Sequence, residues 1–307
     1  MKKIIVTGGS GFLGKHLLRA LTQAGYQVKN IDLVDNNEFE TVIADVRDSA
    51  KMMIEIKDAD LVFHLASLIQ AGESVEKPQL YTDYNIDGTI SVLEAMRVNG
   101  IKNFVFSSSA AVYGEPLHIP IKEDDRTIPI NPYGMTKLAM EGLLSSYVKA
   151  FGFTGVALRY FNLYGPGEDH QPETHAIPRF VKQIFEGSEV TIYGQGQHQR
   201  DYIYISDIVD AHLKTIELCL KQPQKYHYFN LSTQVPTTVL QLVQTIEQVM
   251  GKKAQLKYLP ERPGDPLQLY ADASKSKQIL GWQSQVSLEA GMKQTVEYFI
   301  NRWQETK

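Results

Sequence analysis

A glycine-rich loop between an apolar strand and an amphipathic helix constrains the fold of this chain more than any other feature. Residues 3–7 are rich in β-branched side chains, and a Gly-x-Gly-x-x-Gly pattern follows at Gly9, Gly11 and Gly14. Glycines at this spacing allow a tight turn and close approach of the backbone to a pyrophosphate, which the N–H groups of the next helix attract. The loop therefore predicts a dinucleotide site. The residues expected to contact the dinucleotide are Gly8, Gly11, Phe12, Leu13 and Gly14.

Short apolar runs alternate with helical patterns through the first half of the chain. The expected strands are residues 3–7, 28–33, 41–44, 61–65, 104–106 and 155–160, and the expected helices are residues 12–23, 85–99 and 133–151. The run at residues 61–65 is almost continuously apolar, which is typical of a strand buried on both faces of a sheet. This alternation predicts an α/β fold in which a doubly wound parallel sheet, the Rossmann fold, has helices on both faces.

The pattern changes after about residue 165, where Gly, Pro and His interrupt the periodic segments. Helices are expected at residues 178–186, 205–220, 238–250 and 287–303, and strands at residues 190–193, 226–231 and 256–258. We expect a smaller C-terminal α/β lobe that binds the substrate. The expected boundaries are residues 1–165 for the dinucleotide domain, with a returning segment at about 202–231, and residues 166–201 and 232–307 for the substrate lobe.

Acidic residues stand at the end of the second expected strand and just after the third. Asp32 stands where a carboxylate can accept hydrogen bonds from the hydroxyls of the adenosine ribose. It would repel a 2′-phosphate, and no Arg or Lys lies within residues 33–40 to receive one, so NAD rather than NADP is predicted. Asp35 is an alternative, because the ends of expected strands are uncertain by a few residues. Asp45 and Val46 are expected near the adenine.

Tyr133 and Lys137 are four residues apart in an expected helix, so both lie on one face. A nearby ammonium, together with a cationic nicotinamide ring, favours the phenolate and lowers the pKa of a tyrosine, which can then exchange a proton with a substrate hydroxyl. The alternative is an ordinary pair on a helix surface. Ser107, Ser108 and Ser109 end a buried strand, and ligands bind at the carboxyl ends of such strands. A serine there can hold the substrate oxygen against Tyr133.

Further motifs recur in order along nearly the whole chain. They are Thr7-Gly8-x-x-Gly11-x-x-Gly14, His64-Leu65-Ala66, Glu73-Ser74-Val75, Asn85 with Gly88-Thr89, Ser107 to Gly114, Pro132-Tyr133-Gly134-x-x-Lys137, Leu158 to Asn162, Arg200-Asp201-Tyr202, and Arg262 to Asp265. With these motifs the sequence resembles the extended short-chain dehydrogenase/reductase family, and most of all its nucleotide-sugar epimerases that act on UDP-glucose. The resemblance implies a Rossmann fold and tightly bound NAD.

The resemblance also implies roles for single residues. The catalytic triad would be Ser109, Tyr133 and Lys137, of which Ser109 and Tyr133 would also contact the substrate. The further cofactor-binding residues would be Leu65, Ala66, Asn85, Ser107 and Tyr160, beside Tyr133 and Lys137. The resemblance assigns Asn162 to the diphosphate, Tyr193 to the uracil and Asp265 to the nucleotide ribose. Arg200 and Arg262 are expected to bind the diphosphate and the nucleotide, because guanidinium groups match phosphate oxygens.

The turn after Ser109 bears on the reaction that the resemblance implies. Relatives that dehydrate the sugar place acidic residues there, whereas this chain has Ala110 and Ala111, which can do no acid–base work. The implied reaction is therefore the return of hydride to C4 of a UDP-hexose, which interconverts UDP-glucose and UDP-galactose. Leu269 stands where the family admits or excludes bulky C2 substituents. The alternatives are epimerisation of UDP-N-acetylglucosamine or UDP-glucuronate, another nucleotide-sugar modification, and a silent NAD-binding sensor.

Composition excludes several other classes of protein. A net charge of −4 disfavours a nucleic-acid binder, and no apolar run reaches the length of a membrane span. A single cysteine, Cys219, allows no intrachain disulfide, so we expect a cytoplasmic protein. No metal is expected, since the histidines form no ligand motif. The expected helices at residues 85–99 and 133–151 look apolar over more than one face, and the resemblance implies that they form a four-helix interface in a homodimer.

Overall fold

Seven parallel strands form the central sheet of the computed structural model, which describes residues 2–169, 175–261 and 266–305. Their order across the sheet is β11-β6-β5-β4-β1-β2-β3. The strands are β1 (Lys3–Thr7), β2 (Gln27–Asp32), β3 (Thr41–Ile43), β4 (Leu61–His64), β5 (Asn103–Ser109), β6 (Thr154–Tyr160) and β11 (Tyr226–Leu231). All neighbouring pairs are parallel. The predicted fold class is confirmed.

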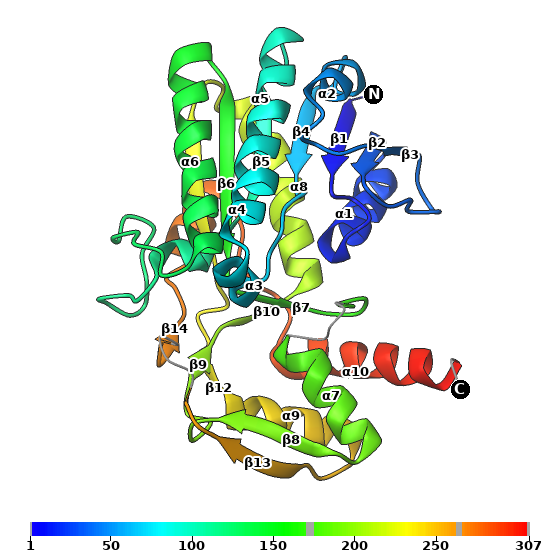
Figure 1. Cartoon of the computed structure of the whole chain (residues 1–307), viewed down its shortest axis with the longest axis vertical. Coiled ribbons are helices and arrows are strands. Elements are labelled where there is room, and N and C mark those ends of the chain that lie inside the picture. Colours follow the sequence, from blue (N-terminus) through cyan, green and yellow to red (C-terminus); the bar gives the residue numbers. More distant parts are fainter. Residues whose placement is uncertain (1, 170–174, 262–265, 306–307) are drawn as a thin grey trace.

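Helices cover both faces of this sheet (Figure 1). The helices are α1 (Phe12–Gln23) and α8 (Ile205–Lys221) on one face, and α2 (Ser49–Glu55), α5 (Gly88–Val98) and α6 (Pro132–Phe151) on the other. Successive strand side chains point to opposite faces. In β1, Ile4 and Val6 therefore pack with α1 and α8, while Ile5 packs with α2 and α5. This two-sided burial explains why the strands are apolar at nearly every position.

Smaller elements lie beyond the carboxyl ends of the strands, in the lower half of Figure 1. They are β7 (Asn162–Tyr164), α7 (Ala176–Glu186), β8 (Glu189–Tyr193), β9 (Gln199–Arg200), β10 (Tyr202–Tyr204), β12 (Thr237–Thr238), α9 (Val239–Met250), β13 (Gln255–Leu259), β14 (Gln268–Leu269) and α10 (Leu288–Glu305). Strand β8 pairs with β13, β7 pairs with β10, and β9 lies between β12 and β14. Among the described residues, no helix is both long and apolar enough to cross a membrane.

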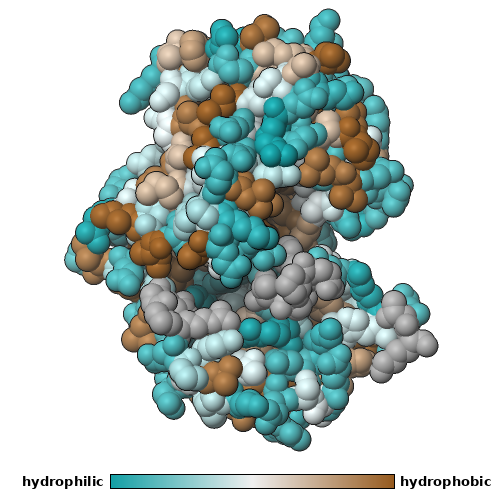
Figure 2. Space-filling view, viewed as in Figure 1, coloured by the Kyte–Doolittle hydropathy of each residue, from teal (hydrophilic) through white to brown (hydrophobic). Residues whose placement is uncertain are grey.

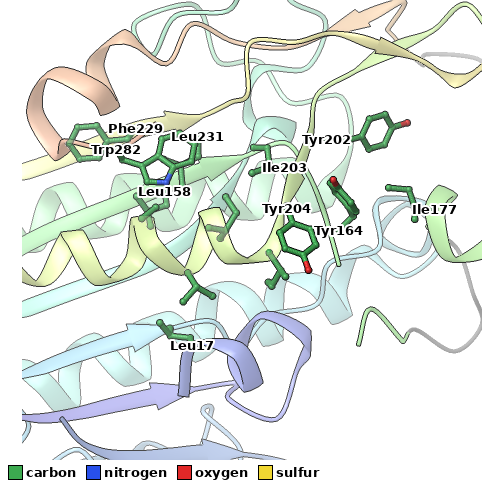
Figure 3. Close-up of a cluster of buried hydrophobic side chains, with 14 of the residues drawn as sticks. Leu17, Leu158, Tyr164, Ile177, Tyr202, Ile203, Tyr204, Phe229, Leu231 and Trp282 are labelled. Carbon is green, nitrogen blue, oxygen red and sulfur yellow. The ribbon is translucent and has the colours of Figure 1, made fainter. Parts of the chain in front are cut away.

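One hydrophobic cluster joins the sheet layer to the smaller elements (Figure 3). Leu17 of α1 is the lowest labelled side chain in the view, Trp282 lies at the left, and Ile177 of α7 lies at the right beside Tyr164 and Tyr204. Trp282 is fully buried in the same cluster, where its indole N–H donates to the Asp207 carbonyl over 2.7 Å. The elements that line the carboxyl edge of the sheet are thus packed on a continuous core.

The helix expected at residues 85–99 is divided in the structure. A wide π-helical turn spans Thr82–Asp87, and α5 begins only at Gly88. The short helices α3 (Ala71–Glu76) and α4 (Pro78–Tyr81) precede this turn, and a 3₁₀ turn at Ala110–Tyr113 follows β5. Another π-helical turn covers Ser276–Leu280. The wide turn carries Asn85, whose contacts are described below.

Candidate active site

The glycine loop lies where the strand order of the sheet reverses, between β1 and β4. Ligands of doubly wound sheets bind in the crevice at this point, beyond the carboxyl ends of the strands. Gly8 has a φ of +77°, and a Cβ there would come within 2.6 Å of the Ala66 backbone nitrogen. A Cβ on Gly14 would lie 2.4 Å from the Gly8 carbonyl oxygen. Packing within the protein therefore requires glycine at both positions.

Gly11 differs from these two glycines. It begins α1 in an extended conformation, is exposed, and a Cβ there would meet only the Gly8 carbonyl oxygen, at 3.3 Å. No packing contact of the described chain requires glycine here, and the free N–H groups at the start of α1 follow directly. A side chain would instead fill the space over the helix N-terminus, where an anion binds. The loop therefore fits the pyrophosphate of a dinucleotide.

Asp32 ends β2 next to this loop. Its carboxylate accepts hydrogen bonds from the Ser10 backbone N–H over 2.9 Å and from the Val34 N–H over 3.1 Å. Each oxygen keeps further acceptor capacity for a ribose hydroxyl. Asp35 lies farther along the exposed loop and accepts from the Asn37 N–H, so Asp32 is the better placed of the two alternatives.

The two residues expected near the adenine, Asp45 and Val46, already contact other groups of the protein. Arg47 binds the Asp45 carboxylate, with Nη2 2.6 Å from Oδ2, and this interaction lowers the pKa of Asp45. The Arg47 guanidinium also lies 3.7 Å from the centre of the Tyr84 ring. Val46 is buried, and a Cβ on Gly88 would lie 2.9 Å from its side chain. Asp45 therefore already has a cationic partner within the protein.

The side chain of Asn85 hydrogen-bonds to other groups of the protein. Its Oδ1 accepts from the Leu68 N–H over 2.8 Å, while Nδ2 donates to the Leu68 carbonyl over 3.1 Å and to Thr136 Oγ1 over 2.9 Å. The predicted cofactor residues Leu65 and Ala66 come just before Leu68, and their backbone packs against Gly8 of the glycine loop. The amide of Asn85 thus ties the segment after β4 to α6.

The structure brings Ser109, Tyr133 and Lys137 together at the carboxyl end of β5. Helix α6 begins at Pro132 because the Asn131 side chain accepts from the Gly134 N–H over 2.9 Å, a standard N-cap. Tyr133 and Lys137 then lie on one face, with the Lys137 ammonium 5.8 Å from the centre of the Tyr133 ring. Burial raises the pKa of Tyr133, and a hydrogen bond with Ser109 partly offsets this rise. The cluster therefore combines a phenol, a serine hydroxyl that hydrogen-bonds to it, and an ammonium group.

Lys137 is buried and its ammonium has neutral partners. Nζ donates to Ser67 Oγ and to the Ser107 carbonyl oxygen, each over 2.8 Å. Burial lowers the pKa of Lys137 to about 7. Ser107 is likewise buried, and Tyr160, whose pKa is raised by burial, lies opposite Ser109 in the β5–β6 pair. The predicted residues Ser107 and Tyr160 therefore lie within the same cluster.

The protein's own groups do not produce the expected fall in the pKa of Tyr133. Lys137 and the nicotinamide ring were expected to lower the pKa of Tyr133 together. The protein's own groups raise it, because burial outweighs the hydrogen bond with Ser109. The ammonium itself loses charge on burial, which weakens its effect on the phenol. Lowering the pKa of Tyr133 therefore needs a further positive charge beside the ring.

Two of the predicted substrate residues lie side by side, and a third lies apart from them. Asn162 donates from its backbone N–H and from Nδ2 to the Asp201 carbonyl, over 2.9 and 3.2 Å. Arg200 precedes Asp201 and lies opposite Leu269 in the β9–β14 pair. Tyr193 lies in β8, in a separate two-stranded sheet. Arg262 and Asp265 fall outside the described residues. Figure 2 shows the surface hollowed between the sheet and the smaller elements.

Three further groups near the site, Asp201, Ser67 and Glu141, were not predicted from the sequence. Asp201 is fully buried and accepts from Ser232 Oγ and from the Thr233 N–H, so it ties the Arg200 segment to the end of β11. Ser67 contacts Lys137, and Glu141 binds Arg159. The Arg200-Asp201-Tyr202 motif was a signal for Asp201, whereas the other two contacts depend on tertiary packing.

Metal binding has no support in the described part of the chain, where no group of three His, Cys, Asp or Glu side chains is placed to hold an ion.

Known proteins resemble the chain over nearly its whole length. A model of the NAD dependent epimerase/dehydratase family matches residues 4–231. The UDP-glucose 4-epimerase of Lactobacillus helveticus is 37% identical over 303 residues, which cover 92% of this chain and 92% of that protein.

Solved structures show the same likeness. The UDP-glucose 4-epimerase of Thermotoga maritima with UDP-glucose has a TM-score of 0.92 and 34% identity, covering 98% of this chain and 99% of that one. The UDP-glucose 4-epimerase of Brucella ovis in complex with NAD has a TM-score of 0.93 and 34% identity, covering 97% and 98%. With its sheet, its glycine loop and these relatives, the chain belongs to the NAD dependent epimerase/dehydratase family.

Proposed function

We propose that this protein is an NAD-dependent 4-epimerase of UDP-hexoses that interconverts UDP-glucose and UDP-galactose. The observation that carries the proposal is the cluster of Ser109, Tyr133 and Lys137 beside the glycine loop, at the carboxyl end of β5. The UDP-glucose 4-epimerases of similar sequence and structure support the same reaction.

The chain's own residues would hold the cofactor along one edge of the sheet. The Gly8–Gly14 loop would bind the pyrophosphate, Asp32 the adenosine ribose, and the Lys137 ammonium would face the other half of the dinucleotide. NAD bound there supplies the acceptor and the donor of the hydride. Its oxidised ring is cationic, which is the further positive charge that Tyr133 needs to lower its pKa.

Tyr133 would exchange a proton with the 4-hydroxyl of the sugar, and Ser109 would hold that oxygen by a hydrogen bond. The residues that follow Ser109 favour epimerisation over dehydration. Ala110 is buried and Ala111 stands in the 3₁₀ turn with its N–H donating to Ser109 Oγ over 3.1 Å. Neither can remove a proton from C5 or protonate a leaving hydroxyl, so return of the hydride to C4 is the remaining route.

Substrate binding would fall to the segments facing the sheet edge. Arg200 and Asn162 would bind the diphosphate, together with Arg262, and Tyr193 and Asp265 would contact the nucleotide. We place the nucleotide sugar between the dinucleotide domain at residues 1–165, joined by residues 202–231, and the lobe formed by residues 166–201 and 232–307. We also propose a cytoplasmic location, which the single cysteine supports.

The test is direct. The purified protein, without added coenzyme, is incubated with UDP-galactose, and the sugar nucleotides are separated by chromatography. UDP-glucose is expected to form until the two sugars reach equilibrium. UDP-N-acetylglucosamine and UDP-glucuronate are assayed beside it, and faster conversion of either would reassign the substrate. A folded protein that contains NAD and converts none of these sugars would contradict the proposal.

A further inference from the structure

Two neutral oxygens hold the Lys137 ammonium. Ser67 Oγ and the Ser107 carbonyl oxygen each lie 2.8 Å from Nζ. They lie beside the carboxyl ends of two neighbouring parallel strands. Ser67 comes three residues after β4 ends, and Ser107 belongs to β5. An ammonium has three N–H groups, so two acceptors in fixed places also set the direction of the third.

Ser67 is held in place by a closed ring of contacts. Asn85 bonds both backbone groups of Leu68, the next residue, and reaches Thr136, the residue before Lys137. Thr136 donates in turn to the Tyr133 carbonyl over 2.8 Å. The segment that carries Ser67 is therefore fixed to the same turn of α6 that carries Tyr133 and Lys137.

The charge of Lys137 depends on these neutral contacts. No carboxylate of the described residues pairs with Nζ, and the titratable groups that face it are Tyr133 and His64. His64 is buried, with its pKa lowered to about 3, so it is neutral. Because no counter-charge lies beside the ammonium, loss of a single acceptor has a large effect on the pKa of Lys137.

We propose that Ser67 is a positioning residue for catalysis, whose hydroxyl fixes the Lys137 ammonium and directs its third N–H toward the Tyr133 side of the site. The catalytic consequence rests on the proposed function, whereas the contact with Lys137 does not. Without the hydroxyl, the ammonium keeps one protein acceptor and gives up its proton more readily.

The first test follows the pH dependence of kcat for UDP-galactose in the NAD-containing protein. In Ser67→Ala, the pH at which activity falls on the basic side is expected to move down by about one unit. Because the pKa of Lys137 is about 7, this makes the variant about tenfold slower near pH 8, about twofold slower near pH 6 and nearly normal near pH 5. Ser67→Thr keeps the hydroxyl and is expected to restore the wild-type profile. Ser146→Ala, which removes a serine that bonds only within α6, is the control and leaves the profile unchanged.

The second test needs no activity. Urea unfolding is measured at pH 6, where Lys137 is charged, and at pH 9, where it is neutral. Ser67→Ala is expected to lower the unfolding midpoint more at pH 6 than at pH 9, relative to wild type, and Ser146→Ala is expected to show no such difference. The proposal would be overturned if Ser67→Ala lowered the unfolding midpoint equally at both pH values and left the basic side of the kcat profile unchanged. A pH-dependent loss in a protein that epimerises no sugar would retain the Ser67 contact and reject the proposed function.

Discussion

Glu141 of α6 and Arg159 of β6 form a buried, two-pronged ion pair, with Nε 2.8 Å from Oε1 and Nη2 2.5 Å from Oε2. Glu141 also accepts from Ser108 Oγ over 2.6 Å. Ser108 lies between Ser107 and Ser109, and Glu141 lies one helical turn beyond Lys137. These contacts fix the position of α6 along β5 and β6, and with it the positions of the proposed catalytic side chains.

Glu141→Gln is expected to destabilise the protein strongly. The variant leaves the Arg159 guanidinium buried without its counter-charge, which costs about 3–5 kcal/mol. Urea unfolding measures the loss. Glu217→Gln, which breaks the exposed pair with Lys221, is the control and is expected to leave the midpoint unchanged. Similar midpoints for the two variants would show that the buried pair contributes no more than a surface contact.

Tyr133→Phe is expected to remove turnover while leaving the cofactor in place. The variant keeps the ring but loses the hydroxyl that would carry the proton, a change worth about 10²–10⁴-fold in rate. NAD content is measured by absorbance after denaturation, and conversion of UDP-galactose by chromatography. Tyr258→Phe, on the exposed strand β13, serves as the control. Undiminished activity would remove Tyr133 from the mechanism.

The fold was predictable because its strands are apolar on both faces and its helices are periodic. The sequence predicted the bounds of β1 and α1 correctly, and those of β2 to within one residue. The strands β9, β12 and β14 have only two residues each, too few for any alternation to be detected. They form only because distant segments meet beyond the sheet edge.

The candidate site was predictable where residues lie close in sequence. Spacing alone predicts that Tyr133 and Lys137 share a helix face and that the serines end one strand. The resemblance to the family implied that Ser109 joins the other two. Ser67 could not be found in this way, because its contact with Lys137 spans 70 residues of sequence. The raised pKa of Tyr133 was missed for a related reason, since burial is a property of the packed protein and has no local sequence signal.

The stability of the protein is expected to fall in acid partly because of His64. Its imidazole is buried between Thr7 Oγ1 and Thr89 Oγ1, at 2.8 and 3.1 Å, and its pKa is lowered to about 3 from 6.5. The unfolded chain therefore binds a proton that the folded protein excludes between pH 6.5 and about 3. Stability falls as the pH drops through this window, by up to about 1.4 kcal/mol per pH unit.

Urea unfolding of His64→Gln between pH 7 and 4 tests this linkage. The variant is expected to be less stable than wild type at pH 7 but to lose less stability on acidification. His118→Gln, an exposed histidine, is the control and should keep the wild-type slope. An unchanged slope in His64→Gln would show that His64 is not a source of the acid sensitivity.

We predict that the protein is a homodimer joined through α5 and α6 as a four-helix bundle. The helices are linked by a hydrogen bond from Tyr147 to Glu94, and they expose Val98, Met135 and Phe151. Large exposed apolar side chains on adjacent helices favour burial in an interface. Light scattering is expected to give about twice the chain mass of 34.6 kDa.

Met135→Glu tests which surface makes the dimer. A carboxylate at a buried interface is expected to weaken association and to shift the mass toward 34.6 kDa at micromolar concentration. Leu256→Glu adds the same charge on β13, at the opposite end of the molecule in Figure 1, and should leave the mass unchanged. A wild-type protein with the mass of a single chain would contradict the dimer.

The glycine loop offers a test that separates folding from cofactor binding. Gly14→Ala places a Cβ 2.4 Å from the Gly8 carbonyl oxygen, so it is expected to cost more than about 2 kcal/mol of stability. Gly11→Ala meets no atom closer than 3.3 Å, and its φ of −74° suits alanine, so its stability is expected to stay equal or to rise by about 0.4–1 kcal/mol. Its methyl group, however, occupies the space predicted for the pyrophosphate, and bound NAD should fall at least about tenfold. Urea unfolding of NAD-free protein and the NAD content of purified protein are measured for both variants. Gly11→Ala that retains NAD would show that the dinucleotide does not approach the loop at this glycine.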